Sequence, residues 1–226
     1  MPKRTNNIES IRAKLLHISA RMFLTEGYDK ATIRKIIAES NLSSGTVTCA
    51  FKTKESVVCE LVKYVLEKQF SFAENLLQGK TDDKILFYAA ETTLQLYMAE
   101  SNENVRKLYN VAYSLPNSSE IIYHTITEKL ENIFKEILPN WQTKDFYERE
   151  IASAGVMRNY MSVPCDMYFT MDRKVKGFIE STLLLYRVPD EKIKQAIEFV
   201  SQFDFSALAK QIIDGKLAEL EKTEEK

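Results

Sequence analysis

The sequence contains few residues that interrupt helices and few that form cross-links. Its 226 residues include six glycines, five prolines and three cysteines. So few glycines and prolines exclude a collagen-like or low-complexity chain and leave long segments without a helix breaker. The cysteines are odd in number and form no Cys-x-x-Cys pair, which argues against a disulfide framework and indicates free thiols in a reducing compartment.

Long hydrophobic runs are also missing. No stretch of about eighteen apolar residues occurs, which is the length that crosses a membrane as a helix. The N-terminal segment MPKRTNNIES lacks the apolar core of a secretory signal. We therefore expect a cytoplasmic protein with no membrane partner.

Motifs for catalysis or metal binding are not found. Neither glycine-rich phosphate loops nor the Gly-x-Ser-x-Gly nucleophile pattern occurs. The two histidines, His17 and His124, lack Cys, His or carboxylate neighbours at metal-ligand spacing. Glu148 and Glu150 are interpreted as solvated residues on a charged helix surface rather than as a catalytic pair. The sequence predicts no enzyme, no metal and no cofactor.

Apolar residues recur at steps of three and four along most of the chain, so we predict an all-α protein. Caps, glycines and prolines divide it into helices. The predicted ranges are 8–26, 32–40, 43–52, 54–78, 82–100, 102–114, 118–138, 144–162, 171–187, 190–203 and 205–221. In the helix 54–78, the stripe Val57, Val58, Leu61, Val65 and Leu66 is expected to face inward.

The second and third predicted helices have the spacing of a helix-turn-helix. Thr32 is a good N-cap for the second helix, and Ser43 or Ser44 can cap the third. Asn41 lies where the chain must turn, and asparagine tolerates the left-handed conformation well. Val47 and Phe51, four residues apart, are expected to face inward. The outward positions would be Ser44, Thr46, Thr48 and Cys49, which would meet a DNA major groove.

Charge is distributed unevenly along the chain. Residues 1–56 hold ten Lys or Arg and five Asp or Glu, whereas the remainder holds 21 and 27. The net charges are therefore +5 and −6, and the positive part carries the helix-turn-helix pattern. This agreement favours nucleic-acid binding, although an ordinary solvated surface gives the same excess.

The N-terminal motifs resemble those of the tetracycline-repressor (TetR) family over residues 10–60. The shared residues are Gly27-Tyr28, Thr32, Arg34, Ser43-x-Gly45-Thr46 and Phe51-Lys52-x-Lys54-Glu55. The resemblance implies a DNA-binding domain, residues 1–53, and a helical effector-binding and dimerisation domain, residues 54–226. It further implies a ligand-responsive regulator, chiefly a repressor, whose homodimer binds a palindromic double-stranded DNA operator.

The resemblance also suggests which residues carry each role. The DNA-binding candidates are Thr32, Arg34, Lys35, Ser43, Ser44, Thr46, Thr48, Cys49, Lys52 and Lys54. Aromatic and methionine residues are dense in the larger part, and they can line a pocket for a small apolar or aromatic effector or simply pack the core. The ligand-binding candidates are Tyr88, Tyr97, Tyr109, Tyr113, Met157 and Tyr160.

Family members usually dimerise through a late pair of helices, which corresponds to 144–162 and 171–187. Small residues at 152, 154 and 155 would allow the helices of two chains to approach closely, and Ile179, Leu183 and Leu184 would supply apolar area. The alternative is that these residues pack within one chain.

The third helix departs from the family pattern at Ser44, Thr48 and Ala50, where the family often has Lys, Tyr and an aromatic residue or His. Ile37 also replaces a small Ala. These departures support an alternative, in which the chain is a TetR-like ligand-binding or protein-interaction module that has lost specific DNA binding.

Overall fold

The computed structural model describes residues 3–222, and within this range the chain forms eleven α-helices and no strand. This confirms the all-α prediction. The helices are α1 (Lys3–Thr25), α2 (Ile33–Ser40), α3 (Ser44–Ala50), α4 (Lys54–Leu77), α5 (Lys84–Ser101), α6 (Glu103–Ala112), α7 (Pro116–Phe134), α8 (Thr143–Ser162), α9 (Met171–Leu185), α10 (Asp190–Val200) and α11 (Phe205–Lys222).

Most helix ends follow the local signals. Gly27 ends α1 with a φ of +93°, a conformation that costs glycine nothing. However, α1 begins at Lys3 rather than at residue 8, and α7 ends at Phe134 rather than at residue 138. The amides of Ile137 and Leu138 both donate to the carbonyl of Phe134, so the chain turns there. Pro139 disfavours the helical conformation of Leu138, the residue before it, and so does not by itself account for this earlier end.

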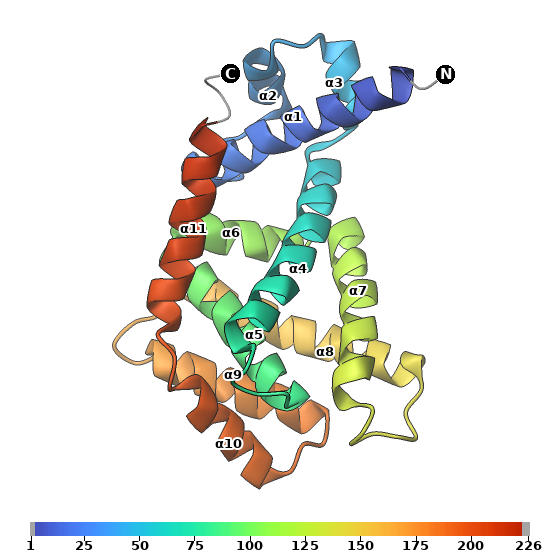
Figure 1. The fold of residues 1–226 in the computed structure, drawn as a ribbon. Helices are drawn as coiled ribbons and strands as arrows, with labels where there is room; N and C mark the ends of the chain where they lie inside the picture. The colour runs from blue at the N-terminus through green and yellow to red at the C-terminus, as the bar shows by residue number, and fades with distance from the viewer. Residues whose placement is uncertain (1–2, 223–226) are drawn as a thin grey trace.

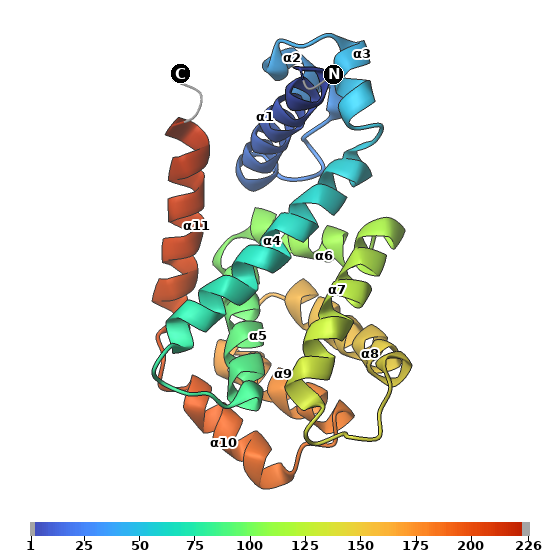
Figure 2. The same cartoon turned by 45° about the vertical axis from the view of Figure 1, so that its right-hand side comes forward.

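Helix α4 connects two hydrophobic clusters, one formed by α1–α3 with the first half of α4, and a larger one formed mainly by α5–α11. Figures 1 and 2 show α4 running from the three N-terminal helices into the larger bundle. The smaller cluster also includes Ala112 and Ile122, from α6 and α7. The two parts are therefore packed together without a flexible tether between them.

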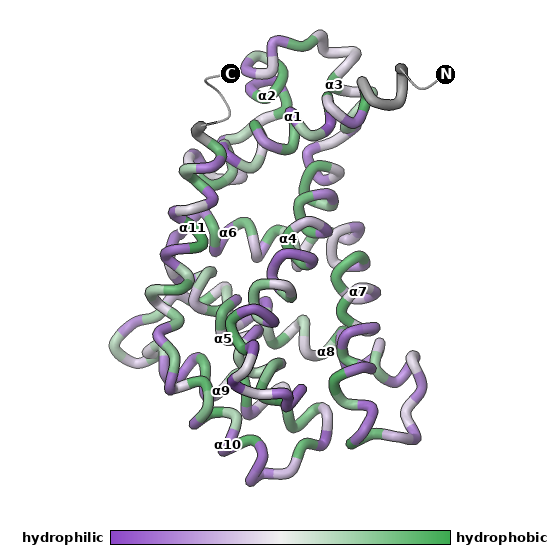
Figure 3. Tube along the Cα trace, viewed as in Figure 1, coloured by the Kyte–Doolittle hydropathy of each residue, from purple (hydrophilic) through white to green (hydrophobic). Residues whose placement is uncertain are grey.

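The predicted apolar stripe of α4 is wrong at one position. Val65 is 36% exposed, whereas Val62 and Phe70 are buried with Leu66. Steps of four from Val58 pass through Val62, Leu66 and Phe70, so this row faces the core and Val65 lies one position to its side. Green and purple segments alternate along most helices in Figure 3, as expected for helices with one apolar face.

Helices α8 and α9 divide their apolar residues between the core and the surface. Ile179 and Leu183 are fully buried within the chain, so they cannot supply a dimer interface as the sequence suggested. Ile151 and Leu184 are instead 45% and 57% exposed. The buried Lys174 fixes the loop between these helices, because its Nζ donates to Glu100 Oε2 and to the Val163 carbonyl, each at 2.6 Å.

Helix α11 returns to the N-terminal helices. It runs alongside α5 and reaches α1 (Figures 1 and 2), where His17 Nε2 lies 2.7 Å from the carbonyl oxygen of Leu220. None of the helices in residues 3–222 has both the length and the apolar character needed to cross a membrane.

Candidate DNA-binding surface and internal cavity

The turn between α2 and α3 is fixed by local hydrogen bonds. Asn41 has φ 53° and ψ 27°, the left-handed conformation predicted for it. Ser40 Oγ donates to the Ile37 carbonyl at 2.9 Å and accepts from the Leu42 amide at 3.2 Å. The sharp change of direction therefore needs no glycine.

Helix α3 presents a short polar face. Ser43 caps it by accepting the Thr46 amide at 3.1 Å, and Val47, Ala50 and Phe51 are buried beneath it. Thr46 is half-buried, and its hydroxyl lies 2.8 Å from Ser43 Oγ. The exposed candidates on and beside α3 are Ser43, Ser44, Thr48 and Cys49. They share the end of the molecule at which α2 and α3 lie (Figure 1).

The basic DNA-binding candidates differ in whether they form ion pairs within the protein. Arg34 and Lys52 are exposed, and neither makes an ion pair with any residue in the described range 3–222. Lys35 is exposed beside the α2 N-cap Thr32 but pairs with Glu26 at 2.6 Å. Arg34 and Lys52 are therefore the most available cations near α2 and α3.

Lys54 is turned toward the protein. Its Nζ donates to the Tyr28 carbonyl at 2.8 Å and lies 3.7 Å from the centre of the Tyr28 ring. Burial lowers the pKa of this ammonium group. Lys54 thus ties the start of α4 to the loop after α1 while remaining only half-buried.

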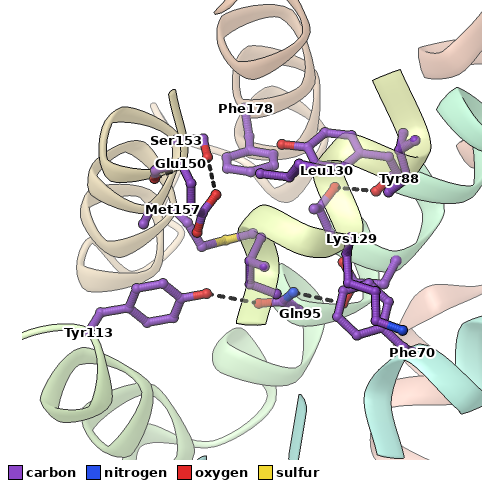
Figure 4. Close-up of a pocket in the computed structure, with 15 residues that line it drawn as sticks. Phe70, Tyr88, Gln95, Tyr113, Lys129, Leu130, Glu150, Ser153, Met157 and Phe178 are labelled. Carbon is purple, nitrogen blue, oxygen red and sulfur yellow. Dashed lines mark hydrogen bonds between the residues drawn. The ribbon is translucent and has the colours of Figure 1, made fainter. Parts of the chain in front are cut away.

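A cavity lies inside the larger part of the molecule and is partly open to solvent. Side chains from α4, α5, α7, α8 and α9, and from the residue that caps α6, converge on it (Figure 4). Its lining consists of Phe70, Tyr88, Glu91, Thr92, Gln95, Tyr113, Ile126, Lys129, Leu130, Ile133, Glu150, Ser153, Ala154, Met157 and Phe178.

The cavity brings together three of the six predicted ligand-binding residues, namely Tyr88, Tyr113 and Met157. The other three lie outside its lining. The ring of Tyr97 stacks on Phe205 with centroids 5.9 Å apart. The hydroxyl of Tyr109 lies 4.0 Å from Met98 Sδ. Tyr160 makes edge contacts with Phe169 and Phe178.

Two glutamates in the cavity lining were missed by the sequence analysis. Glu150 is only 4% exposed, so its interpretation as a solvated surface residue is wrong. Glu91 is 3% exposed and was not considered. Both had a signal in the sequence. Glu150 follows the buried Phe146 by four residues and precedes Met157 by seven, which places it on the inward side of α8. Glu91 is the only charged residue between positions 85 and 99.

Each glutamate belongs to a separate hydrogen-bond chain. Tyr113 OH donates to Gln95 Oε1 at 3.4 Å, and Gln95 Nε2 donates to Glu91 Oε1 at 2.8 Å (Figure 4). Gln69 Nε2 donates to the same oxygen. On α8, Ser153 Oγ donates to Glu150 Oε2 at 2.6 Å and lies 3.1 Å from Tyr186 OH.

Burial opposes the negative charge on both carboxylates. It raises the pKa of Glu91 to about 7, although hydrogen bonds from Gln69 and Gln95 favour the ionised form. Burial also raises the pKa of Glu150 to about 8, and repulsion from Glu91 adds to the effect. Both groups are therefore poised to change charge near neutral pH.

Comparison with known proteins identifies the N-terminal part. Residues 15–61, from the middle of α1 into α4, match the family described as "Bacterial regulatory proteins, tetR family". The N-terminal helices of this chain form a TetR-type module. It is also similar to the uncharacterized HTH-type transcriptional regulator YerO of Bacillus subtilis, with 20% identity over 188 residues. The match covers 79% of this chain and 63% of that protein, so the chain spans less than two thirds of the length of this relative.

The family match bears on the departures noted in α3. Ala50 is 6% exposed and packs in the smaller hydrophobic cluster, so its side chain faces the core rather than the outer surface. Ser44 and Thr48 are exposed and uncharged. The outer face of α3 is therefore polar but carries no cation of its own.

Proposed function

We propose that this protein is an effector-responsive regulator of transcription of the TetR family, chiefly a repressor, which binds a palindromic DNA operator in the cytoplasm. The observation that carries the proposal is the exposed polar face of α3 beside the unpaired cations Arg34 and Lys52. An α-helix of this kind fits the major groove, and neighbouring cations hold the phosphate backbone.

We assign the DNA contacts to two groups of residues. Ser44, Thr48 and Cys49 lie on the exposed face of α3 and would contact base edges, with Thr46 limited by its bond to Ser43. The backbone contacts would come from Thr32, Arg34, Lys35, Ser43, Lys52 and Lys54. Within this second group Arg34 and Lys52 would contribute most, because Lys35 and Lys54 have partners in the protein.

The larger part, residues 54–226, would hold the effector in the internal cavity. The aromatic and aliphatic side chains in the walls of the cavity suit a small ligand with apolar or aromatic character. Phe70 lines the cavity from α4, and the same helix reaches α1–α3 at its other end. A ligand that favours one position of α4 would thereby favour one arrangement of the DNA-binding domain.

A homodimer would present two such domains to two half-sites of DNA. We propose the outer faces of α8 and α9 as its interface. Ile151 and Leu184 are exposed there, and Ala152 and Gly155 are exposed small residues that permit close helix approach. Ile179 and Leu183 are buried in the core of one chain, so they would hold α9 in place and would not contact the second chain.

A random pool of short DNA duplexes tests the proposal. Selection by the purified protein, followed by sequencing, should enrich a palindrome whose half-sites lie about one helical turn or a multiple of it apart. Failure of a folded dimer to enrich any sequence would overturn the DNA-binding proposal.

A second function has one specific observation in its favour. The ammonium groups of Lys54 and Lys35 contact other groups of the protein, and α3 contains no basic residue. Few cations are therefore available to contact phosphates. This arrangement suits a ligand-binding or protein-interaction module without specific DNA binding. The same selection separates the two functions, because such a module would return no enriched sequence.

A further inference from the structure

The internal cavity has an unusual charge balance for a site lined largely by carbon. Glu91 and Glu150 both line it, and each is at most 4% exposed. No Lys, Arg or His within residues 3–222 lies at ion-pairing distance from either carboxylate. Buried carboxylates are costly to ionise unless a cation compensates them. Lys129 is the one basic residue of the lining, and it is exposed and forms an ion pair with neither carboxylate.

The hydrogen bonds leave acceptor capacity on both groups. Glu91 receives its two donors, Gln69 and Gln95, on Oε1 alone. Glu150 receives Ser153 on Oε2 alone. The second oxygen of each carboxylate accepts no hydrogen bond within the described part of the chain. A bound group that donates hydrogen bonds or carries positive charge would find these oxygens available.

The remaining walls also favour positive charge. Four aromatic rings line the cavity, from Phe70, Tyr88, Tyr113 and Phe178. The face of an aromatic ring attracts a cation within about 6 Å. At the rim this already occurs, since the ammonium of Lys129, whose side chain is exposed, lies 5.0 Å from the centre of the Phe70 ring.

We propose that the cavity binds a small organic cation, with an amine or quaternary ammonium group held by Glu91 and Glu150 and an apolar or aromatic body held by the rings. The inference rests on the proposed effector-responsive function and gives the chemical class of the effector. Once ionised, the same two carboxylates would repel an anionic effector.

Proton release should accompany binding. The other titratable groups near the glutamates are the phenols of Tyr88, Tyr109, Tyr113 and Tyr186, and burial raises the pKa of each, so they stay neutral. The two glutamates are therefore the groups of the cavity lining whose charge we expect to change between pH 5 and pH 8. A cation favours their ionised forms, so its affinity should rise with pH over this range.

The test compares three probes of similar shape and different charge. They are benzyltrimethylammonium, its neutral carbon analogue neopentylbenzene, and the anion phenylmethanesulfonate. Binding to the full chain is measured by calorimetry in two buffers of different ionisation enthalpy, which reports the protons released. The cation should bind at least tenfold more tightly than the other two and should release protons at pH 6. Equal affinity for the cation and the neutral analogue, or no binding of the cation, would overturn the proposal.

Three variants test whether Glu91 and Glu150 bind the cation. Glu91→Gln and Glu150→Gln should each weaken benzyltrimethylammonium binding at least tenfold and reduce the proton release. Glu148→Gln is the matched control, since Glu148 lies two residues away on α8 and is exposed. Circular dichroism establishes that each variant folds. Unchanged affinity in both cavity variants would overturn the assignment.

The assay contains no DNA, so its result is separate from that of the proposed function. A chain that binds the cation but enriches no duplex keeps the cation site and loses the regulatory role. A chain that enriches a palindrome but binds no cation keeps the regulatory role and loses the cation site.

Discussion

At the scale of single residues, Glu150 makes the stability of this protein depend on pH. Its carboxyl has a folded pKa of about 8 against an ordinary value of 4.5. Between these values the folded chain keeps a proton that the unfolded chain releases, so the free energy of unfolding falls as pH rises. Glu91, with a folded pKa of about 7, acts in the same direction over a narrower range.

Replacing Glu150 by Gln should therefore flatten this dependence. The wild type should lose stability as the pH rises from 5 to 8, whereas Glu150→Gln should lose less. The difference in the free energy of unfolding, variant minus wild type, should therefore increase by an amount on the order of 2–4 kcal/mol between the two pH values. Urea unfolding at the two pH values measures the difference. Glu148→Gln, at an exposed position on the same helix, should follow the wild type. A Glu150→Gln variant with the same pH slope as the wild type would show that Glu150 ionises normally in the folded state.

A second residue-scale prediction concerns Asn41, whose φ of 53° is unfavourable for most side chains. Asn41→Val should destabilise the protein by about 1–2 kcal/mol, because a β-branched residue clashes with its own backbone in this conformation. Asn41→Gly is the matched control and should leave the stability within about 0.5 kcal/mol. Chemical denaturation at one pH measures both changes, and equal stability of the two variants would contradict the left-handed turn.

At the scale of elements, the sequence predicts the helices well because their signals are local. Thr32, Asn41 and Ser43 each act on neighbouring backbone groups, and each has the role expected of it. Val65 shows the limit of apolar patterning, since a valine beside the buried row of α4 looks the same in sequence as one within it. Pro139 leads to a predicted end of α7 at residue 138, four residues beyond the observed end at Phe134.

The candidate sites could be predicted only in part. The outer face of α3 follows from helical spacing, so most of its exposed residues were anticipated. The cavity is different, because its lining depends on how five helices and the residue that caps α6 pack together, and packing between distant helices leaves no local pattern. Tyr88 and Tyr97 look alike in sequence, yet only Tyr88 lines the cavity. The charge of Glu150 indicates a surface position, whereas its spacing from Phe146 places it on the buried side of α8.

At the scale of the whole molecule, the outer faces of α8 and α9 should hold two chains together. Replacing both Ile151 and Leu184 by Glu should convert a dimer into a folded monomer at micromolar concentration, because paired apolar surface would become charged. Sedimentation velocity measures the change. Val65→Glu, at an exposed apolar position on α4, is the control and should stay dimeric. A double variant that remains dimeric would place the interface elsewhere.

The central claim is that the α2–α3 surface binds DNA, and one salt titration tests it most directly. The affinity for the enriched duplex is measured by fluorescence anisotropy at several salt concentrations between roughly 50 and 200 mM, with wild type and with the double variant Arg34→Ala/Lys52→Ala. The wild-type affinity should fall steeply with salt. The variant should bind more weakly, with a salt slope smaller by roughly 3–4, because a dimer would lose four phosphate contacts. Equal slopes in the two proteins, or binding that is insensitive to salt, would contradict the account.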